Sequence, residues 1–501
     1  MSDPSPQDRA AFGDRVFAVV AGPWAVAALV LAVTGARLAL LAGPVAPPVM
    51  PDEAALWLLA QAPRPAWPDV GWLPPWLLGW LSERCGADGP CLRLLAPLAH
   101  GITAWLMYRL GSVLFDPRTG FWCAVVTITL PLVMLGGLMI GSLTLMLPLW
   151  TLALLALART RAETGLGPWV ALGVGVGLGL LMHPLMALFV PLAMLYLMTA
   201  DAPAGLWRSP GPAVAVLLAA VLVLPDLVWN AQNGWAGYER LWRSLSTGWP
   251  ARGDALGALL PSLGLGTVLA GPVLAGVLAW LLLRLPAEAM GGAFRDYRVR
   301  LLVVFTVPVL AATLALTLVW DTGAMLTAPA VPAAVAMGVG WLTVRERVGW
   351  LRAAVVLNLL VAGLLLRGPD LAARAGWVVP EPADLFAAGR GWDPAGRWLA
   401  TLAETYDGTP IGAAGPWAPL LAYHGARADV PVRVIGTAAD AGAAAFRGLL
   451  VMPAALADAD GGADDGADDG AARDVRARLT VTLPDGRRRA WAAVLVPAEA
   501  P

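Results

Sequence analysis

Eleven apolar runs, each close to the length needed to cross a bilayer, constrain the fold of this chain more than any other feature. A helix needs roughly 20 apolar residues to span the hydrocarbon core, and its backbone polar groups must be satisfied within the segment. Hydrophobic residues make up 58% of the sequence and charged residues 14%, which is typical of membrane proteins. We therefore expect an α-helical polytopic membrane protein with about 11 transmembrane helices. The runs lie near residues 16–43, 92–115, 120–136, 140–158, 167–182, 184–199, 212–229, 257–283, 299–319, 324–343 and 349–366.

The positions of the arginines predict the orientation of these helices, because cytoplasmic loops are enriched in basic residues. The chain has no lysine, and a cytoplasmic N-terminus (residues 1–15) places most connecting-loop arginines on the inner side. The inner residues are Arg9, Arg15, Arg118, Arg159, Arg161, Arg208, Arg284, Arg295, Arg298, Arg300, Arg345 and Arg347. The transmembrane domain, residues 16–366, then has outer loops at 44–91 and 230–256. Only the second of these loops is itself rich in arginine, and it is long enough to cross despite that charge.

Residues 367–501 are expected to form a small extracytoplasmic α/β domain. The stretches "VPVRVIG" and "GLLVMP" are typical of short buried strands. Near the end, alternating residues on either side of Pro484, Asp485 and Gly486 predict a hairpin. The acidic low-complexity segment 458–474 is interpreted as a solvated insertion, because a calcium loop requires a late bidentate Glu, which is absent.

Two of the three cysteines, Cys85 and Cys91, share the first outer loop, and Cys123 falls in an apolar run. An oxidising compartment would allow the first two to form a disulfide. Two unpaired buried thiols are an equally good interpretation, and the sequence leaves both open.

Motifs in the predicted outer loops resemble those of glycosyltransferase family 39, the bacterial branch that includes aminoarabinose transferases of lipid A and relatives of protein mannosyltransferases. The matching residues are Asp52 and Glu53 before "AALWLLAQ", Pro74 and Pro75 in "LPPWLLGWL", Arg93 at the start of the next apolar run, and Trp229, Asn230, Ala231, Gln232 and Trp235 in "LPDLVWNAQNGWAGYERL". The resemblance extends over most of residues 16–430 and is most specific in the two outer loops.

This resemblance implies the C-type glycosyltransferase fold and a multi-pass protein of the bacterial inner membrane. It implies transfer of a sugar from a polyprenyl phosphate donor to a lipid or protein acceptor on the periplasmic face, with a divalent metal as a cofactor in some relatives. The net charge of −1 offers no basic surface for nucleic acid. Asp52 and Glu53 are the candidate catalytic residues, since a carboxylate within hydrogen-bond reach can take the proton of an acceptor hydroxyl. The alternative for Asp52 is a structural N-cap on a helix beginning near Ala54.

Six further residues are candidates for substrate binding: Arg37, Arg93, His183, Asn230, Gln232 and Trp235. Each has a structural alternative. The two arginines would extend toward the membrane surface, the histidine would pack at a helix junction, and the other three would pin the second outer loop at the interface. His100 is expected to be a packed residue without ligand.

Several family positions differ here and favour a second hypothesis. Trp72 and Leu73 replace an Asp-His pair, Leu143 stands where relatives carry a second aspartate, and His183 replaces a lysine. His183 would meet a phosphate only when protonated. The chain is then a catalytically reduced relative that acts as a lipid-binding or scaffold protein, unless other outer acids substitute. The available acids are Asp69, Asp226 and Asp321.

Overall fold

The computed structural model divides into two compact units, which we describe separately. The helical unit comprises Met1–Pro44, Arg64–Pro74 and Arg93–Gly363, and the mixed unit comprises Val45–Pro63, Pro75–Leu92 and Leu364–Pro501. The residues that the structure describes are 22–61, 71–86, 89–161, 163–199, 206–239, 263–290, 295–319, 324–377, 379–380, 384–435, 446–454, 474–482 and 488–496.

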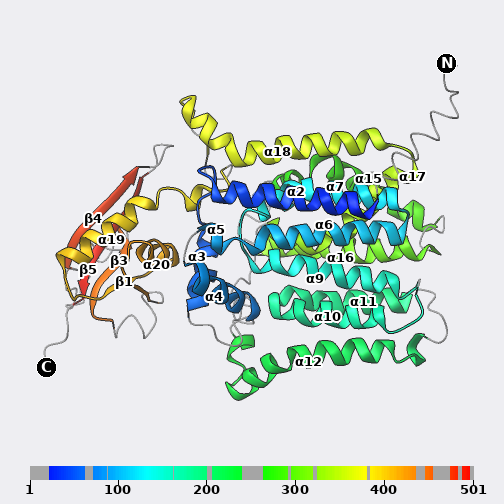
Figure 1. Cartoon of the computed structure of the whole chain (residues 1–501), viewed down its shortest axis with the longest axis horizontal. Coiled ribbons are helices and arrows are strands. Elements are labelled where there is room, and N and C mark those ends of the chain that lie inside the picture. Colours follow the sequence, from blue (N-terminus) through cyan, green and yellow to red (C-terminus); the bar gives the residue numbers. More distant parts are fainter. Residues whose placement is uncertain are drawn as a thin grey trace. The chain divides into compact units, whose positions relative to one another are not determined.

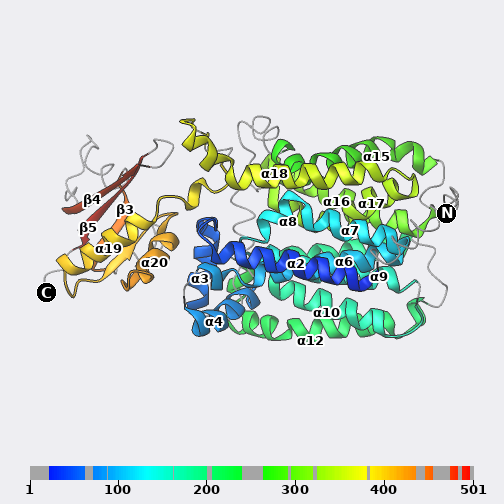
Figure 2. The ribbon, with the colours of Figure 1, turned by 45° about the horizontal axis from the view of Figure 1, so that its top comes forward.

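Long apolar helices run side by side in the helical unit (Figure 1). Their boundaries are α2 (Pro23–Ala42), α6 (Leu95–Leu114), α7 (Pro117–Thr129), α8 (Pro131–Gly136), α9 (Ser142–Arg159), α10 (Gly167–Met182), η1 (Pro184–Leu188), α11 (Phe189–Thr199), η2 (Leu206–Arg208), α12 (Gly211–Gln232), α15 (Pro272–Met290), α16 (Tyr297–Val319), η4 (Ala324–Ala330), α17 (Val331–Val344) and α18 (Val348–Arg374), the last of which continues into the mixed unit. Figure 2 shows the same bundle after a rotation of 45°.

Every expected apolar run overlaps at least one helix, but several runs are broken. Among the described residues, six helices are long and apolar enough to cross a membrane. A seventh is added if Leu263–Leu269 and Pro272–Arg284, which meet at an angle of 116°, are counted as one span. Pro131 separates α7 from α8 in a similar way, since proline cannot donate the backbone hydrogen bond that would continue the helix. The membrane-spanning helical class is confirmed, and the count of eleven stays a prediction.

Glycines allow α6 and α7 to approach closely. A Cβ on Gly120 would lie 2.5 Å from the carbonyl of Tyr108, and one on Gly111 would lie 2.8 Å from Cys123 Sγ. Without a hydrophobic driving force between helices in lipid, close backbone approach of this kind is a main source of helix association. The two glycines therefore set how closely α6 and α7 can pack.

The mixed unit combines helices from the first loop with a five-stranded sheet. Its elements are α3 (Pro51–Gln61), α4 (Leu73–Cys85, which begins in the helical unit), α5 (Gly89–Leu92), η6 (Ala387–Gly389), α19 (Asp393–Thr405), β1 (Ile411–Ala413), α20 (Ala418–Ala426), β2 (Val432–Val434), β3 (Gly448–Pro453), β4 (Asp474–Thr482) and β5 (Arg488–Val496). The strand order is β2-β1-β3-β5-β4. β1 is parallel to β2 and β3, and β5 is antiparallel to β3 and β4.

The expected hairpin is β4–β5, in which Thr482 pairs with Arg488 next to the turn. β4 runs along one edge of the sheet, with β5 as its partner strand within the described residues and a register shift between Val475 and Ala477. The helix α20 connects β1 to the parallel strand β2, as a crossover between parallel strands requires. α19 lies against the sheet in Figure 1.

An aromatic cluster forms the core of the mixed unit. Trp392 is 1% exposed, and its ring centroid lies 5.0 Å from that of Trp491. Arg489 lies over the ring of Trp392 and donates hydrogen bonds to the carbonyls of Ala387, Ala388 and Arg390. These hydrogen bonds and the ring contact hold the half-buried guanidinium in place.

The first-loop helix α3 belongs to this unit through its packing on α20. Trp57 is 6% exposed, and its ring meets that of Tyr423 edge to face, with centroids 5.4 Å apart. Edge-to-face pairs add about 0.5–1.5 kcal/mol to the burial of the two rings. The first loop and the C-terminal segment are therefore one folded body.

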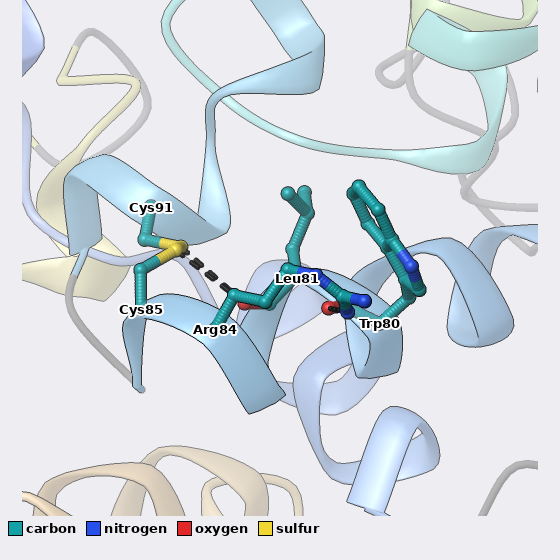
Figure 3. The surroundings of a disulfide bond; sticks show 5 residues. All are labelled: Trp80, Leu81, Arg84, Cys85 and Cys91. Carbon is teal, nitrogen blue, oxygen red and sulfur yellow. Dashed lines mark hydrogen bonds between the residues drawn. A yellow bond between two sulfur atoms is a disulfide. The ribbon is translucent and has the colours of Figure 1, made fainter.

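A disulfide joins Cys85, the last residue of α4, to Cys91 in α5, whereas Cys123 is a free buried thiol (Figure 3). The structure thus selects the bridge from the two alternatives that the sequence left open. On the same helical turn, the Arg84 guanidinium stacks on the Trp80 ring at 4.1 Å.

Some sequence predictions fall on residues outside the described part of the chain. They are the cytoplasmic N-terminus 1–15, nearly all of the acidic segment 458–474, residues 240–256 of the second outer loop, and the candidate acids Asp69 and Asp321.

Candidate functional site

Asp52 and Glu53 both lie in the first turn of α3 but in different surroundings. The helix begins at Pro51 rather than near Ala54, so the expectation that Asp52 caps a later helix start is wrong. Asp52 is exposed. Its pKa is raised above the ordinary value of 3.8, first because the surrounding protein displaces part of its hydration and second because Glu53 is negatively charged. A raised pKa makes this carboxylate a better proton acceptor than an ordinary aspartate.

Glu53 is 1% exposed and holds the start of α3. Its Oε2 accepts a hydrogen bond from the Met50 backbone N–H at 2.9 Å. This is the glutamate half of a capping box, in which the third helical residue reaches back to the N-cap amide. The contact supports a structural role for Glu53, and its catalytic role stays a prediction.

Arg37 is buried among the helices of its unit. It is 5% exposed, and its Nη2 donates to the Ile128 carbonyl at 2.7 Å. Its Nε and Nη1 have no acceptor within the described residues. A Cβ on Gly137 would lie 3.0 Å from Arg37 Nη1, so the absence of a side chain there makes room for the guanidinium.

His100 lies beside this arginine region as a packed residue. It is 3% exposed, and a Cβ on Gly136 would lie 2.9 Å from its Nε2. The consecutive glycines Gly136 and Gly137 thus accommodate one polar side chain each. Arg93, just before α6, is also buried, with 2% exposure, and takes part in interactions with its neighbours.

His183 occupies the junction between α10 and η1, as expected for a structural residue. Its Nδ1 accepts a hydrogen bond from the Leu185 backbone N–H at 3.0 Å. Burial lowers the pKa of His183 to about 4, so the imidazole is neutral at pH 7. The neutral ring caps the 3-10 helix through this hydrogen bond. A phosphate contact through a charged His183 stays a prediction.

Asn230 closes the turn that follows α12. It is 1% exposed, its Nδ2 donates to the Asp226 carbonyl, and its Oδ1 accepts from the Gly237 backbone N–H at 3.1 Å. The Asp226 carboxylate accepts a hydrogen bond from the Tyr238 hydroxyl at 2.6 Å. Asn230 therefore has a structural role at the start of the second outer loop.

Gln232 and Trp235 are exposed on this turn and keep their candidate role in binding. Trp235 is 50% exposed and adopts a backbone φ of 60°, in the left-handed region. Non-glycine residues in that region concentrate where surrounding structure or function demands them. Here the Trp235 backbone N–H donates a short hydrogen bond of 2.7 Å to the Asn230 carbonyl, which helps to hold this conformation.

Two departures from the family pattern are visible in the structure. Leu143, at the place of the second aspartate, lies in the first turn of α9 and is half-buried. Leu73 begins α4, and Trp72 precedes it. None of these three positions offers an ionisable group. Of the eight candidate residues, Asp52 and Glu53 belong to the mixed unit and the other six to the helical unit.

An apolar cavity of about 470 Å³ lies within the helical unit, between Leu263–Leu269, α15, α16, η4 and α17. Its walls are mainly leucine, valine and alanine. Two of its threonine hydroxyls donate to backbone carbonyls, Thr267 to Leu263 at 2.8 Å and Thr313 to Val309 at 3.0 Å. The cavity therefore offers a hydrocarbon-like surface. Sequence patterns did not reveal it, because it arises from helices that are distant in the chain.

The family model of dolichyl-phosphate-mannose-protein mannosyltransferase matches residues 69–229. The lipid A galacturonosyltransferase RgtD of Rhizobium johnstonii is 27% identical over 188 residues, which are 36% of this chain and 38% of that protein. The match thus spans less than half the length of this relative. The family model and the relative are both named as glycosyltransferases.

The apo structure of ArnT from Cupriavidus metallidurans matches 96% of this chain and 98% of its own, with a TM-score of 0.62 and 15% identity. The chain therefore shares the fold of this ArnT structure. The same ArnT bound to undecaprenyl phosphate matches with a TM-score of 0.60 and 15% identity, over 93% of this chain and 97% of its own.

A more distant match extends this C-type fold beyond lipid-modifying enzymes. The oligosaccharyltransferase of Archaeoglobus fulgidus matches 87% of this chain and 70% of its own, with a TM-score of 0.52 and 11% identity. The resemblance drawn from the two outer loops is thus confirmed at the level of the C-type glycosyltransferase fold.

The described residues of this C-type fold do not fit a metal centre. Within them, no three His, Cys, Asp or Glu side chains come together. Of the two candidate catalytic acids, Glu53 already accepts a hydrogen bond from the Met50 amide.

Proposed function

We propose that the chain transfers a sugar from a polyprenyl phosphate donor to a lipid acceptor at the periplasmic face of a bacterial inner membrane, with Asp52 as general base. The observation that carries the proposal is the Asp52 carboxyl, which is open to solvent in the first turn of α3 and has a raised pKa. The relatives support the substrate classes. One is named for lipid A, and one was solved with undecaprenyl phosphate.

In the proposed reaction, Asp52 accepts the proton of an acceptor hydroxyl as its oxygen attacks the anomeric carbon of the donor. The new bond joins the acceptor oxygen to the sugar, and the bond between the anomeric carbon and the phosphate oxygen breaks. Polyprenyl phosphate leaves with the electron pair. Attack opposite to the leaving group inverts the anomeric configuration. General-base assistance of this kind contributes typically 10²–10⁴-fold to a rate.

The apolar cavity of the helical unit suits the hydrocarbon part of such a donor. A polyprenyl chain has no hydrogen-bonding group, and the hydroxyls of Thr267 and Thr313 in the cavity wall are already bonded to the backbone. Because the chain enters from lipid rather than from water, its binding in such walls depends on close packing and not on the hydrophobic effect.

The disulfide supports the proposed sidedness of the first loop. Disulfides persist in oxidising compartments such as the bacterial periplasm and are rare in the cytosol. Cys85 and Cys91 lie in the same loop region as Asp52 and in the same compact unit, so a periplasmic position for one implies it for the other.

A second candidate function is a catalytically reduced protein that binds a polyprenyl-linked lipid without transferring it. The specific observation in its favour is Leu143, which leaves the start of α9 without the second acid of the family. Such a protein would retain the apolar cavity and would not depend on Asp52.

Replacement of Asp52 by Asn distinguishes the two functions. Asn keeps the size of the side chain but cannot accept the proton, so we expect transfer to fall by 100-fold or more. The measurement is the modified envelope lipid in extracts of a deletion strain that expresses either protein. With wild type, the acid limb of the pH–rate profile should lie above pH 3.8, the ordinary aspartate value.

Glu83→Gln is the matched control, because Glu83 is another exposed acid of the first loop, on α4. It should leave transfer unchanged. Equal restoration of the lipid by wild type and Asp52→Asn would contradict the proposed mechanism and favour the reduced protein.

A further inference from the structure

A second cavity, of about 790 Å³, lies wholly within the mixed unit. One wall is the C-terminal half of α3, with Trp57, Leu58 and Gln61. The facing walls come from α19, the segment 407–411, α20 and the segment 430–433. The family motifs do not include these cavity residues beyond α3, and the mechanism above does not use them.

The size and lining of this cavity match a small-molecule site. Such sites occupy about 300–1,000 Å³ and have mostly apolar walls with a few polar groups that orient the ligand. Here the apolar walls include Ile411, Val430 and Pro431, and the polar groups are Gln61, Asp407, Thr409 and Arg433. A folded partner domain would instead need about 800 Å² of surface on each side.

The two charged groups are free to bind a ligand. Asp407 and Arg433 are exposed, and neither side chain has a hydrogen bond or ion pair with any residue that the structure describes. The cavity therefore presents a carboxylate acceptor, guanidinium donors, an amide and a hydroxyl above an apolar floor. A sugar has the complementary chemistry, because its hydroxyl and amino groups both donate and accept while its C–H faces pack on apolar walls. An acyl chain would leave these polar groups unused.

The cavity is connected to Asp52 by a single helix. Gln61 follows Asp52 by nine positions on α3, which corresponds to a rise of about 14 Å at 1.5 Å per residue. A ligand bound at the end of α3 therefore lies at a fixed distance from Asp52, because a helix and not a loop connects the two positions.

We propose that the cavity between α3 and the C-terminal domain binds a saccharide portion of the acceptor, with Asp407 and Arg433 as its polar contacts. The proposal rests on the proposed function, since it supplies that reaction with a glycolipid acceptor. The site holds the acceptor by its carbohydrate while a different hydroxyl reacts at Asp52.

The test measures binding of a glucosamine disaccharide to the full-length protein in phosphatidylcholine nanodiscs by saturation-transfer-difference NMR. We expect Asp407→Asn and Arg433→Ala each to raise the Kd about tenfold or more, because hydrogen bonds to charged groups contribute about 1.5–3 kcal/mol. Arg397→Ala is the matched control, since Arg397 is an exposed arginine of α19 that does not line the cavity. It should leave the Kd unchanged.

Three outcomes would overturn the proposal: no disaccharide binding to the wild type, an equal loss in Arg397→Ala, or displacement of the disaccharide by palmitate. The Asp52→Asn protein separates this inference from the proposed function. It should bind the disaccharide with the wild-type Kd even though it no longer transfers sugar. If Asp52→Asn retains transfer while the cavity variants lose binding, the role of Asp52 as general base is contradicted and the saccharide site is supported.

Discussion

The carboxyl groups of Asp52 and Glu53 show how a single helical turn can separate two neighbouring acids. Successive helical residues point about 100° apart, and here one side chain is exposed while the other is 1% exposed. The burial of Glu53 is offset by its hydrogen bond to Met50. The sequence identifies the acidic pair and its position before a helix. It does not show which of the two faces solvent, because that depends on how α3 packs within the folded unit.

For Arg37 as well, the sequence locates the residue but does not predict its surroundings. Hydropathy places it late in an apolar run, where a charge must either reach the surface or find partners. The choice is decided by Ile128 and Gly137, which lie on other helices or at their ends. A glycine at position 137 is compatible with many structures, so no local signal predicts that it makes room for a guanidinium.

His424 predicts a pH-dependent stability of the mixed unit. It is 9% exposed and stacks on Trp392. Its pKa is lowered to about 4, chiefly by burial; Asp393 opposes this shift and Arg427 adds to it. Because the unfolded histidine binds a proton below about pH 6.5 and the folded one does not until about pH 4, stability is fully present above pH 6.5 and is lost as the pH falls toward 4. The loss is roughly 3 kcal/mol.

Hydrogen-exchange protection of β1 and β3 in the full-length protein measures this loss. His424→Phe keeps an aromatic ring against Trp392 but cannot be protonated, so its protection should change much less between pH 7 and pH 4.5. The same slope in both proteins would assign the acid sensitivity to other groups.

At the scale of elements, apolar periodicity predicts where helices occur better than how they bend. The run expected at 167–182 coincides with α10, because its one proline, Pro168, lies in the first turn, where the missing N–H interrupts no helical hydrogen bond. The run expected at 257–283 is bent by 116° before Pro272. Gly271, which has a positive φ of 79°, makes this bend possible. Glycine and proline in the sequence show where such breaks are possible, and packing against neighbouring helices determines whether they occur.

The cavity beside this bend gives an element-scale prediction. Ala275 on α15 lines the cavity, so Ala275→Phe should fill part of it and raise the KM for the polyprenyl phosphate donor about tenfold, with a smaller change in kcat. Overpacking typically costs 1–3 kcal/mol, and 1.4 kcal/mol is tenfold in affinity. The measurement is initial-rate kinetics in nanodiscs. Val356→Phe, on the exposed face of α18 with Val356 58% exposed, adds the same volume outside the cavity and should leave the KM unchanged. An equal KM for both variants would show that the donor chain does not use this cavity.

At the scale of the whole molecule, two compact units are built from interleaved parts of the sequence. The first loop folds with the C-terminal segment through Trp57 and Tyr423. The sequence indicates a membrane domain and a tail with strands, and the motif resemblance leads to the correct fold type. The pairing of the loop with the tail has no local signal, since it depends on contacts between aromatic residues far apart in sequence.

The proposed orientation of the whole molecule is testable by cysteine labelling. In a Cys123→Ser background, Arg397→Cys in α19 should react with a membrane-impermeant maleimide in intact spheroplasts, because the proposal places the mixed unit in the periplasm. Arg347→Cys, in the exposed turn between α17 and α18, should react only after permeabilisation. The reverse pattern would place Asp52 in the cytosol and would exclude the proposed reaction on the outer face.

The outer strand β4 also affects how the molecule behaves at high concentration. A nine-residue strand at the edge of a sheet has backbone groups that another chain can pair with. Exposed Arg476 and Arg478 lie on this strand beside the register shift at Val475 and Ala477. Like charges would face each other if two copies joined edge to edge, and the irregular backbone would disturb a continuous ladder. The strand thus carries its own protection against self-association, which matters for a protein confined to the two dimensions of a membrane.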